Sequence, residues 1–72
     1  MKFGNTANKI KAILSVIKNN EVVKGREIAK RLSDIGYTVD EGNINMFIYH
    51  NMVYKHLSRE RIKGINYYTP TH

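Results

Sequence analysis

The sequence has no cysteine and no tryptophan, one proline, and six acidic residues against twelve basic ones. Without cysteine the chain has neither disulfides nor thiolate metal ligands, which are typical staples of small secreted domains. No apolar run approaches the ~20 residues of a membrane helix, and the first residues lack the apolar stretch of a signal peptide. We therefore expect a protein of a reducing cytoplasm, nucleoid-associated or in a host cytoplasm if the gene is viral, with no membrane contact.

The motifs of catalysis and of metal binding are also missing. The sequence has no glycine-rich phosphate loop, no Ser-x-x-Lys pair and no carboxylate pair with a nearby histidine. Zinc needs three or four converging ligands, and the candidates are three histidines, His50, His56 and His72. We predict that the chain is not an enzyme, holds no metal or cofactor, and takes no small-molecule substrate.

What the sequence does have is an excess of positive charge on one small domain. A length of 72 residues fits a single domain, residues 1–72, because folding units usually run from about 50 to 200 residues. The net charge of +6 attracts polyanions through long-range fields and counterion release. Nucleic acid is the first partner to consider, but basic proteins are common, so the distribution of the cations must decide.

The first helix is predicted over residues 6–18. Its apolar residues recur at the i, i+3, i+4 and i+7 spacing of one helical face, at Ile10, Ile13, Leu14 and Ile17. Asn5 or Thr6 can cap the start, and Asn19 and Asn20 suit the end. Val22 and Val23 follow as a short extended stub, suited to lie beside a strand.

The second helix is predicted over residues 25–35. One face carries the apolar residues Ile28, Leu32 and Ile35. Glu27 stands four residues before Arg31, as a supporting ion pair would. Gly36 suits the left-handed position just past a helix end.

The third helix is predicted over residues 39–52, and its exposed side is the most informative feature of the chain. Thr38 and Glu41 form a capping box at its start. At 100° per residue the core side holds Ile44, Phe47, Ile48 and Asn51. The far side forms a polar and aromatic stripe without lysine or arginine, made of Asn43, Asn45, Met46, Tyr49 and His50.

The last segment, residues 54–69, is predicted to be a β-hairpin. Two stretches of mixed aromatic, β-branched and polar residues flank Lys63 and Gly64, which indicate a turn. Pro70 ends the second strand because it cannot donate to a ladder. The order of elements predicts a mainly α fold with a C-terminal β-hairpin, of the α+β class.

With this order of elements the chain resembles the winged helix-turn-helix family from Ile10 to about Pro70. The resemblance rests on the stretch from Gly25 to Leu32 as the first helix of the pair, on the capped third helix, and on the basic hairpin. It implies three helices plus a wing that bind double-stranded DNA, with the third helix as reader in the major groove. A transcriptional regulator of bacterial, archaeal or viral origin is the expected role.

The cations fall in two groups that suit contacts with DNA phosphates. One group surrounds the start of the second helix, where free N–H groups also favour phosphate: Lys24, Arg26 and Lys30. The other belongs to the hairpin: Lys55, Arg59, Arg61 and Lys63. Because phosphate contacts position a protein and base contacts specify its site, we predict that the stripe reads bases.

Each stripe residue has a predicted partner. Asn43 and Asn45 suit paired contacts with adenine, and Met46 and Tyr49 suit a thymine methyl group or a sugar. His50 suits a phosphate or a guanine edge. The alternative is that the stripe is simply a solvated helix face and that the hairpin cations block edge pairing.

Other functions remain open from the sequence. Asn45 and Tyr49 are similar to the Asn and Tyr pair of winged helices that bind left-handed nucleic acid, but Glu41 stands where that family usually has a basic residue, and its proline pair and tryptophan are missing. The chain could instead be a protein-interaction or self-association module, such as a homodimer, through apolar side chains near the turn, Ile62 and Ile65. RNA is a third partner, with Tyr67 and Tyr68 stacking on unpaired bases.

Overall fold

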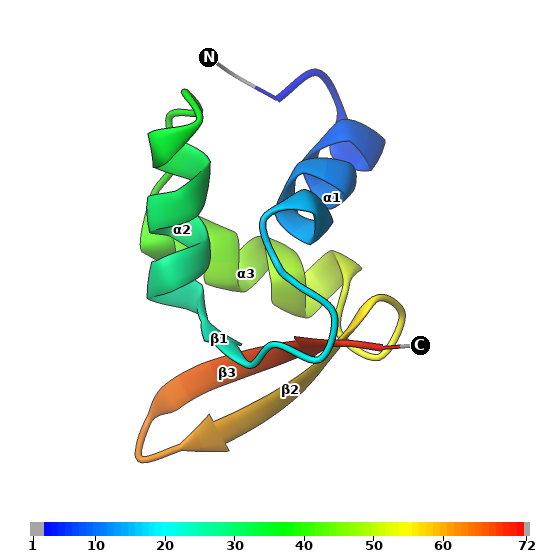
Figure 1. Ribbon diagram of the computed structural model, residues 1–72, viewed down its shortest axis with the longest axis vertical. Helices are drawn as coiled ribbons and strands as arrows, with labels where there is room; N and C mark the ends of the chain where they lie inside the picture. The colour runs from blue at the N-terminus through cyan, green and yellow to red at the C-terminus, as the bar shows by residue number, and fades with distance from the viewer. Residues whose placement is uncertain (1–2, 72) are drawn as a thin grey trace.

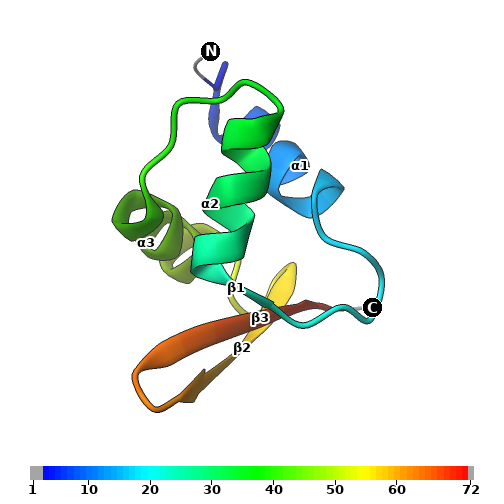
Figure 2. The same ribbon diagram turned by 60° about the vertical axis from the view of Figure 1, so that its left-hand side comes forward.

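Three helices lie on one side of a small antiparallel sheet, and no described segment covers the other side (Figures 1 and 2). The computed structural model describes residues 3–71. The elements in chain order are α1 Thr6–Ser15, β1 Val23–Lys24, α2 Gly25–Asp34, α3 Glu41–Asn51, β2 Leu57–Ile62 and β3 Ile65–Pro70. The predicted α+β class and the C-terminal hairpin are confirmed.

The sheet has the strand order β1-β3-β2. Val23 pairs with Tyr68, so the extended stub does lie beside a strand as predicted. Lys63 and Gly64 form the hairpin turn with φ values of 51° and 80°. Positive φ at both central residues defines a type I′ turn, whose twist matches that of the flanking strands. The hairpin starts later than predicted, because residues 54–56 form a turn before β2.

The core fills the space between the helices and the sheet. Its fully buried large side chains come from every helix and from both strands of the hairpin: Ile13, Ile28, Leu32, Ile44, Ile48, Met52, Leu57 and Tyr68. Ile35, predicted to share one face with Ile28 and Leu32, is 53% exposed, whereas those two side chains are buried. It caps the C-terminus of α2, and the chain turns away there through Gly36 at φ 104°.

The ends of α1 and α3 differ from the predicted ones. The first ends at Ser15 rather than residue 18, because the N–H groups of Val16 and Ile17 bond to carbonyls three residues back and tighten the last turn. The third starts at Glu41 rather than residue 39. Its cap is Asp40, whose Oδ2 accepts a 3.1 Å hydrogen bond from the Asn43 N–H, so the predicted capping box of Thr38 was wrong.

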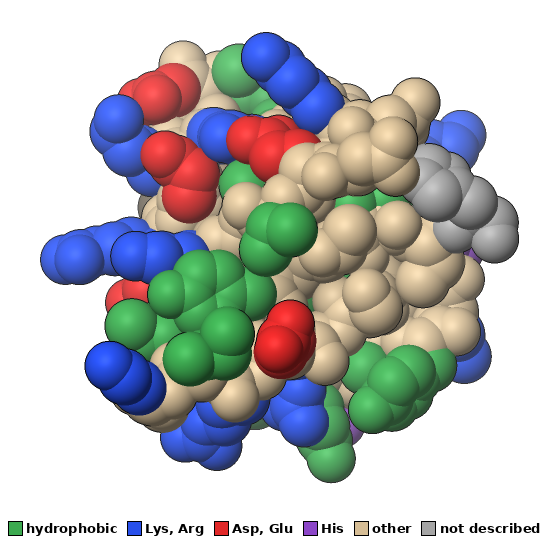
Figure 3. Space-filling view, turned by 60° about the horizontal axis from the view of Figure 1, so that its bottom comes forward, with side chains coloured by type: hydrophobic (Ala, Val, Ile, Leu, Met, Phe, Trp, Pro, Cys, Tyr) green, Lys and Arg blue, Asp and Glu red, His purple; other side chains and the backbone are tan. Residues whose placement is uncertain are grey.

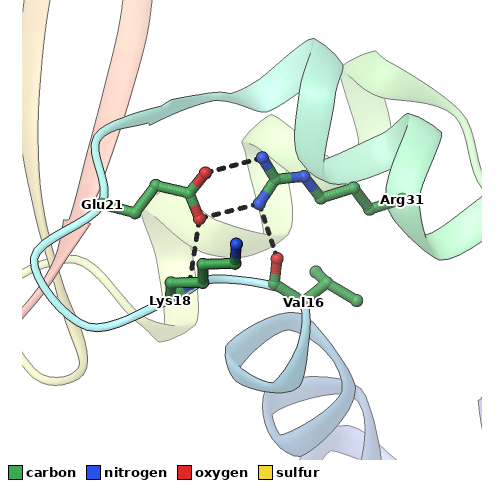
Figure 4. A network of polar contacts seen from close by, with 4 residues as sticks. All are labelled: Val16, Lys18, Glu21 and Arg31. Atoms are coloured by element: carbon green, nitrogen blue, oxygen red, sulfur yellow. Dashed lines mark hydrogen bonds and ion pairs between the residues drawn. The ribbon is translucent and has the colours of Figure 1, made fainter.

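Arg31 holds the loop after α1 against α2 (Figure 4). Its guanidinium donates to both carboxylate oxygens of Glu21, at 2.8 and 2.7 Å, and to the Val16 carbonyl at 2.8 Å. The Lys18 N–H donates to the same carboxylate at 3.0 Å. Arg31 therefore pairs across the fold with Glu21 instead of along its own helix with Glu27, because Glu21 offers a two-pronged contact.

This ion pair predicts a loss of stability in acid. The hydrogen bonds from Arg31 and then from the Lys18 N–H lower the pKa of Glu21 from 4.5 to about 2. A lowered folded-state pKa stabilises the fold above the unfolded pKa, and that contribution is lost as pH falls through the folded one. We expect urea unfolding to show a free energy that declines from pH 4.5 to about 2. Glu21→Gln should flatten this decline, Asp34→Asn should keep it, and equal slopes in wild type and Glu21→Gln would contradict the assignment.

Candidate nucleic-acid interface

The exposed side of α3 carries most of the predicted stripe. Met46 is 59% and Tyr49 55% exposed, and Asn43 and His50 are also exposed. The rings of Tyr49 and His50 meet edge to face, with centroids 5.3 Å apart. The opposite side of the helix buries Ile44 and Ile48, which fixes the direction in which these side chains point. The structure therefore brings these side chains together on one surface.

Asn45 stands apart from the other stripe residues. It is partly buried, and its Oδ1 accepts a 2.7 Å hydrogen bond from the hydroxyl of Tyr68 in β3. Burial raises the pKa of Tyr68, which keeps this hydroxyl protonated as the donor. The predicted paired contact with adenine uses both the oxygen and the nitrogen of the amide, so the oxygen would be shared with Tyr68, and this contact stays a prediction. The hydrogen bond to Tyr68 gives Asn45 a positioning role.

Gly25 allows α2 to approach Asn45 closely. A Cβ atom at position 25 would lie 2.8 Å from Cγ of Asn45, which is closer than van der Waals contact permits. The carboxamide cannot swing away freely because Tyr68 holds it. Gly25, Asn45 and Tyr68 thus join the start of α2, the middle of α3 and the sheet at one point.

A cavity of about 300 Å³ opens beside this joint. Its lining comes from the start of α2, from α3 and from the hairpin turn: Lys24, Gly25, Arg26, Glu41, Asn45, Gly64, Ile65 and Asn66. Lys24 occupies the N-cap position of α2 without a capping hydrogen bond from its side chain, so the first backbone N–H groups keep their capacity to bind an anion. Sequence reasoning missed Glu41 and the turn residues here, because no local pattern records which loop reaches a distant helix.

The arginines of β2 point to the side of the sheet on which the helices lie. In the pleat, Arg59 and Arg61 alternate with outward residues and share a side with buried Leu57. The guanidinium of Arg59 lies 4.8 Å from the ring centroid of Tyr49. At this distance a cation is attracted to an aromatic face, which holds Arg59 beside the exposed side of α3.

The other predicted phosphate contacts lie in four places. Lys30 lines a shallow hollow on α2 with Arg26, and Lys63 is exposed in the hairpin turn. The amine of Lys24 lies 5.9 Å from the ring centroid of Tyr67, over the sheet. Lys55 lines a separate cavity beneath the end of α1, so the structure does not bring it to the stripe. Its position in the turn after α3, rather than in a strand, explains this difference.

Two further predictions concern metals and stacking. Among residues 3–71, no three histidine, aspartate or glutamate side chains come close enough to hold a metal ion, and His72 lies outside the described residues. Tyr67 and Tyr68 were both predicted to stack on RNA bases. Tyr68 is fully buried, so the prediction is wrong for Tyr68. Within the same described range, no helix has the length and apolar character needed to span a bilayer.

Comparisons with family models, with curated proteins and with solved structures give no match to this chain.

Proposed function

We propose that this chain is a winged helix-turn-helix domain that binds double-stranded DNA and acts as a transcriptional regulator by occupying duplex sites. In this proposal α3 enters the major groove and the β2–β3 hairpin lies along the neighbouring backbone as the wing. The proposal gives Met46 and Tyr49 apolar contacts with thymine methyl groups or sugars, and Asn43 the paired contact with adenine. His50 contacts a phosphate or a guanine edge.

One observation carries the proposal: cations from two other elements border the exposed side of α3. Arg59 of the hairpin packs on Tyr49, and Arg26 of α2 shares a cavity with Asn45. Around an uncharged reading surface, such cations suit phosphates on either side of a groove. The proposed phosphate contacts are Arg26, Lys30, Arg59, Arg61 and Lys63, together with the N-terminus of α2.

The salt dependence of binding tests the proposal. Neutralising about four to six phosphates predicts a slope of roughly −4 to −5 for the logarithm of the binding constant against the logarithm of salt concentration. Fluorescence anisotropy of a labelled random-sequence duplex, titrated at several salt concentrations, measures this slope. Unlabelled single-stranded RNA and a left-handed alternating duplex serve as competitors. A slope near zero, or a competitor that displaces the duplex at lower concentration, would overturn the proposal.

Base reading by the stripe is tested on a preferred site selected from a random pool of duplexes. The binding of Tyr49→Ala to this site and to the random-sequence duplex is compared with the binding of the wild type. We expect Tyr49→Ala to weaken binding mainly at the preferred site, and its core stays intact because Tyr49 is exposed.

A further inference from the structure

The sheet has an open face, which we define as the strand side chains that point away from the helices together with Val22 just before β1. Tyr68 and Val23 are buried beneath the helices, so their neighbours in the pleat point the other way. Ile62 is 46%, Ile65 42% and Val22 59% exposed. The members of the open face are Val22, Lys24, Ser58, Glu60, Ile62, Ile65, Tyr67 and Thr69.

The apolar members of the open face gather at its hairpin end. Ile62 and Ile65 are cross-strand partners next to the turn, and Tyr67 follows on the same side of β3. In Figure 3, hydrophobic side chains cluster over this end of the sheet, with lysine and arginine side chains around them. A contiguous apolar surface with a polar rim is typical of a protein contact.

The charges of the open face lie in one row. Lys24 of β1 and Glu60 of β2 are both directly opposite Tyr67, on its two sides. The row therefore reads positive, aromatic, negative from one edge of the sheet to the other. In the opposite direction the same row is negative, aromatic, positive. Two copies of the row that run in opposite directions therefore place opposite charges against each other.

From this row we infer that the open face binds a second copy of the chain, sheet against sheet. A two-fold rotation about an axis parallel to β3 lays one open face on the other and exchanges the edges. Lys24 then lies over Glu60 of the second copy, and the reciprocal pair forms at the other edge. Tyr67 meets its own equivalent between the two ion pairs, and Ile65 meets its own equivalent next to them along β3, as a two-fold interface requires.

The alternative site for a second copy, the free edge of β2, is less suitable. Antiparallel two-fold pairing of two β2 strands centred on Glu60 would place Glu60 opposite itself and Arg59 opposite Arg61. Like charges in these positions oppose pairing and are a common protection of edge strands. Face-to-face packing avoids them, since both arginines point toward the helices. Two such sheets pack with their strand directions within about 30° of each other and with their backbones about 10 Å apart.

A charge exchange tests this interface. The full chain is examined by sedimentation equilibrium from about 10 µM to 1 mM, the range expected for a small interface. Lys24→Glu and Glu60→Lys should each weaken dimerisation about tenfold, because each creates like charges at both edges. The double variant should return to within about threefold of wild type, because it restores both pairs in reverse. Lys11→Glu, an equal charge change on exposed α1, is the control and should leave the dimer unchanged.

Only a dimer that the single variants weaken and the double variant restores supports the interface. A wild-type chain that stays monomeric at about 1 mM would overturn it, and so would a double variant as weak as the single ones. Amide chemical shifts of the wild-type chain on dilution provide a second measurement that needs no variant. Shifts concentrated at Ile65 and Tyr67 support the open face, and shifts concentrated on α1 or α3 overturn it. Neither measurement contains DNA, so failure here is distinct from failure of DNA binding.

Discussion

Reversing the charges of Arg59 and Arg61 together is expected to weaken binding to duplex DNA on the order of 100-fold at about 0.1 M salt. Each substitution to glutamate removes a proposed phosphate contact and places a negative charge beside the same phosphate. Both side chains point to the helix side of the sheet, and Arg59 packs on Tyr49 of α3. The salt slope should become shallower by about 2, one for each contact removed.

The matched control is the double variant Lys11→Glu, Lys55→Glu, which lowers the net charge by the same amount. Lys11 is exposed on α1 and Lys55 lines the cavity beneath the end of that helix, so neither borders the stripe. We expect it to weaken binding less than about fivefold, through the long-range field alone. Equal losses in the two double variants would mean that net charge, and not the surface around α3, governs binding. Circular dichroism confirms in each case that the variant is folded.

Replacing Tyr68 with alanine is expected to remove about 3–5 kcal/mol of the free energy of unfolding. Tyr68 is fully buried and is among the largest buried side chains. A domain of this length has on the order of 4–11 kcal/mol in total, so the variant should lose a large share of its free energy of unfolding. Tyr68→Phe keeps the ring and removes only the hydroxyl that donates to Asn45. Its cost should be about 1–2 kcal/mol.

A double-mutant cycle separates the hydrogen bond from the packing. Asn45→Ala leaves the buried hydroxyl of Tyr68 without its acceptor, and we expect a loss of about 1–3 kcal/mol. In the background of Tyr68→Phe, the same substitution should cost about 1 kcal/mol less, because the bond is already gone. Urea denaturation gives all four values. Costs that simply add would show that the two side chains do not act together, and would contradict the positioning role of Asn45.

Much of the fold could be predicted because its signals are local. The apolar spacing of Ile13 and Ile17, the hairpin turn at Lys63 and Gly64, and the stub at Val23 all depend on neighbours in the chain or on backbone preference. Helix ends were predicted less well, since Asp40 and Thr38 are both acceptable caps and the surrounding packing decides which one is used. Ile35 was predicted to lie on the apolar face of α2, but the turn after α2 carries it outward.

The candidate site could also be predicted only in part from the sequence. Exposure of Met46, Tyr49 and His50 follows from helical periodicity alone, because a helix that buries one side must show the other. The place of Asn45 does not follow from periodicity. It lies at the edge of that exposed side, and its contact with Tyr68 joins residues 23 positions apart. No spacing rule connects them.

The sequence by itself determined the excess of positive charge, the helices, the hairpin and the exposed side of α3, because these depend on composition and on short-range periodicity. Only the tertiary structure decided that Arg31 pairs with Glu21 rather than Glu27, that Arg59 rests on Tyr49 while Lys55 lies elsewhere, and that Lys24 and Glu60 share one row of the sheet. These contacts join segments that are distant along the chain. Their geometry is fixed by how the elements pack, and packing is a property of the whole chain.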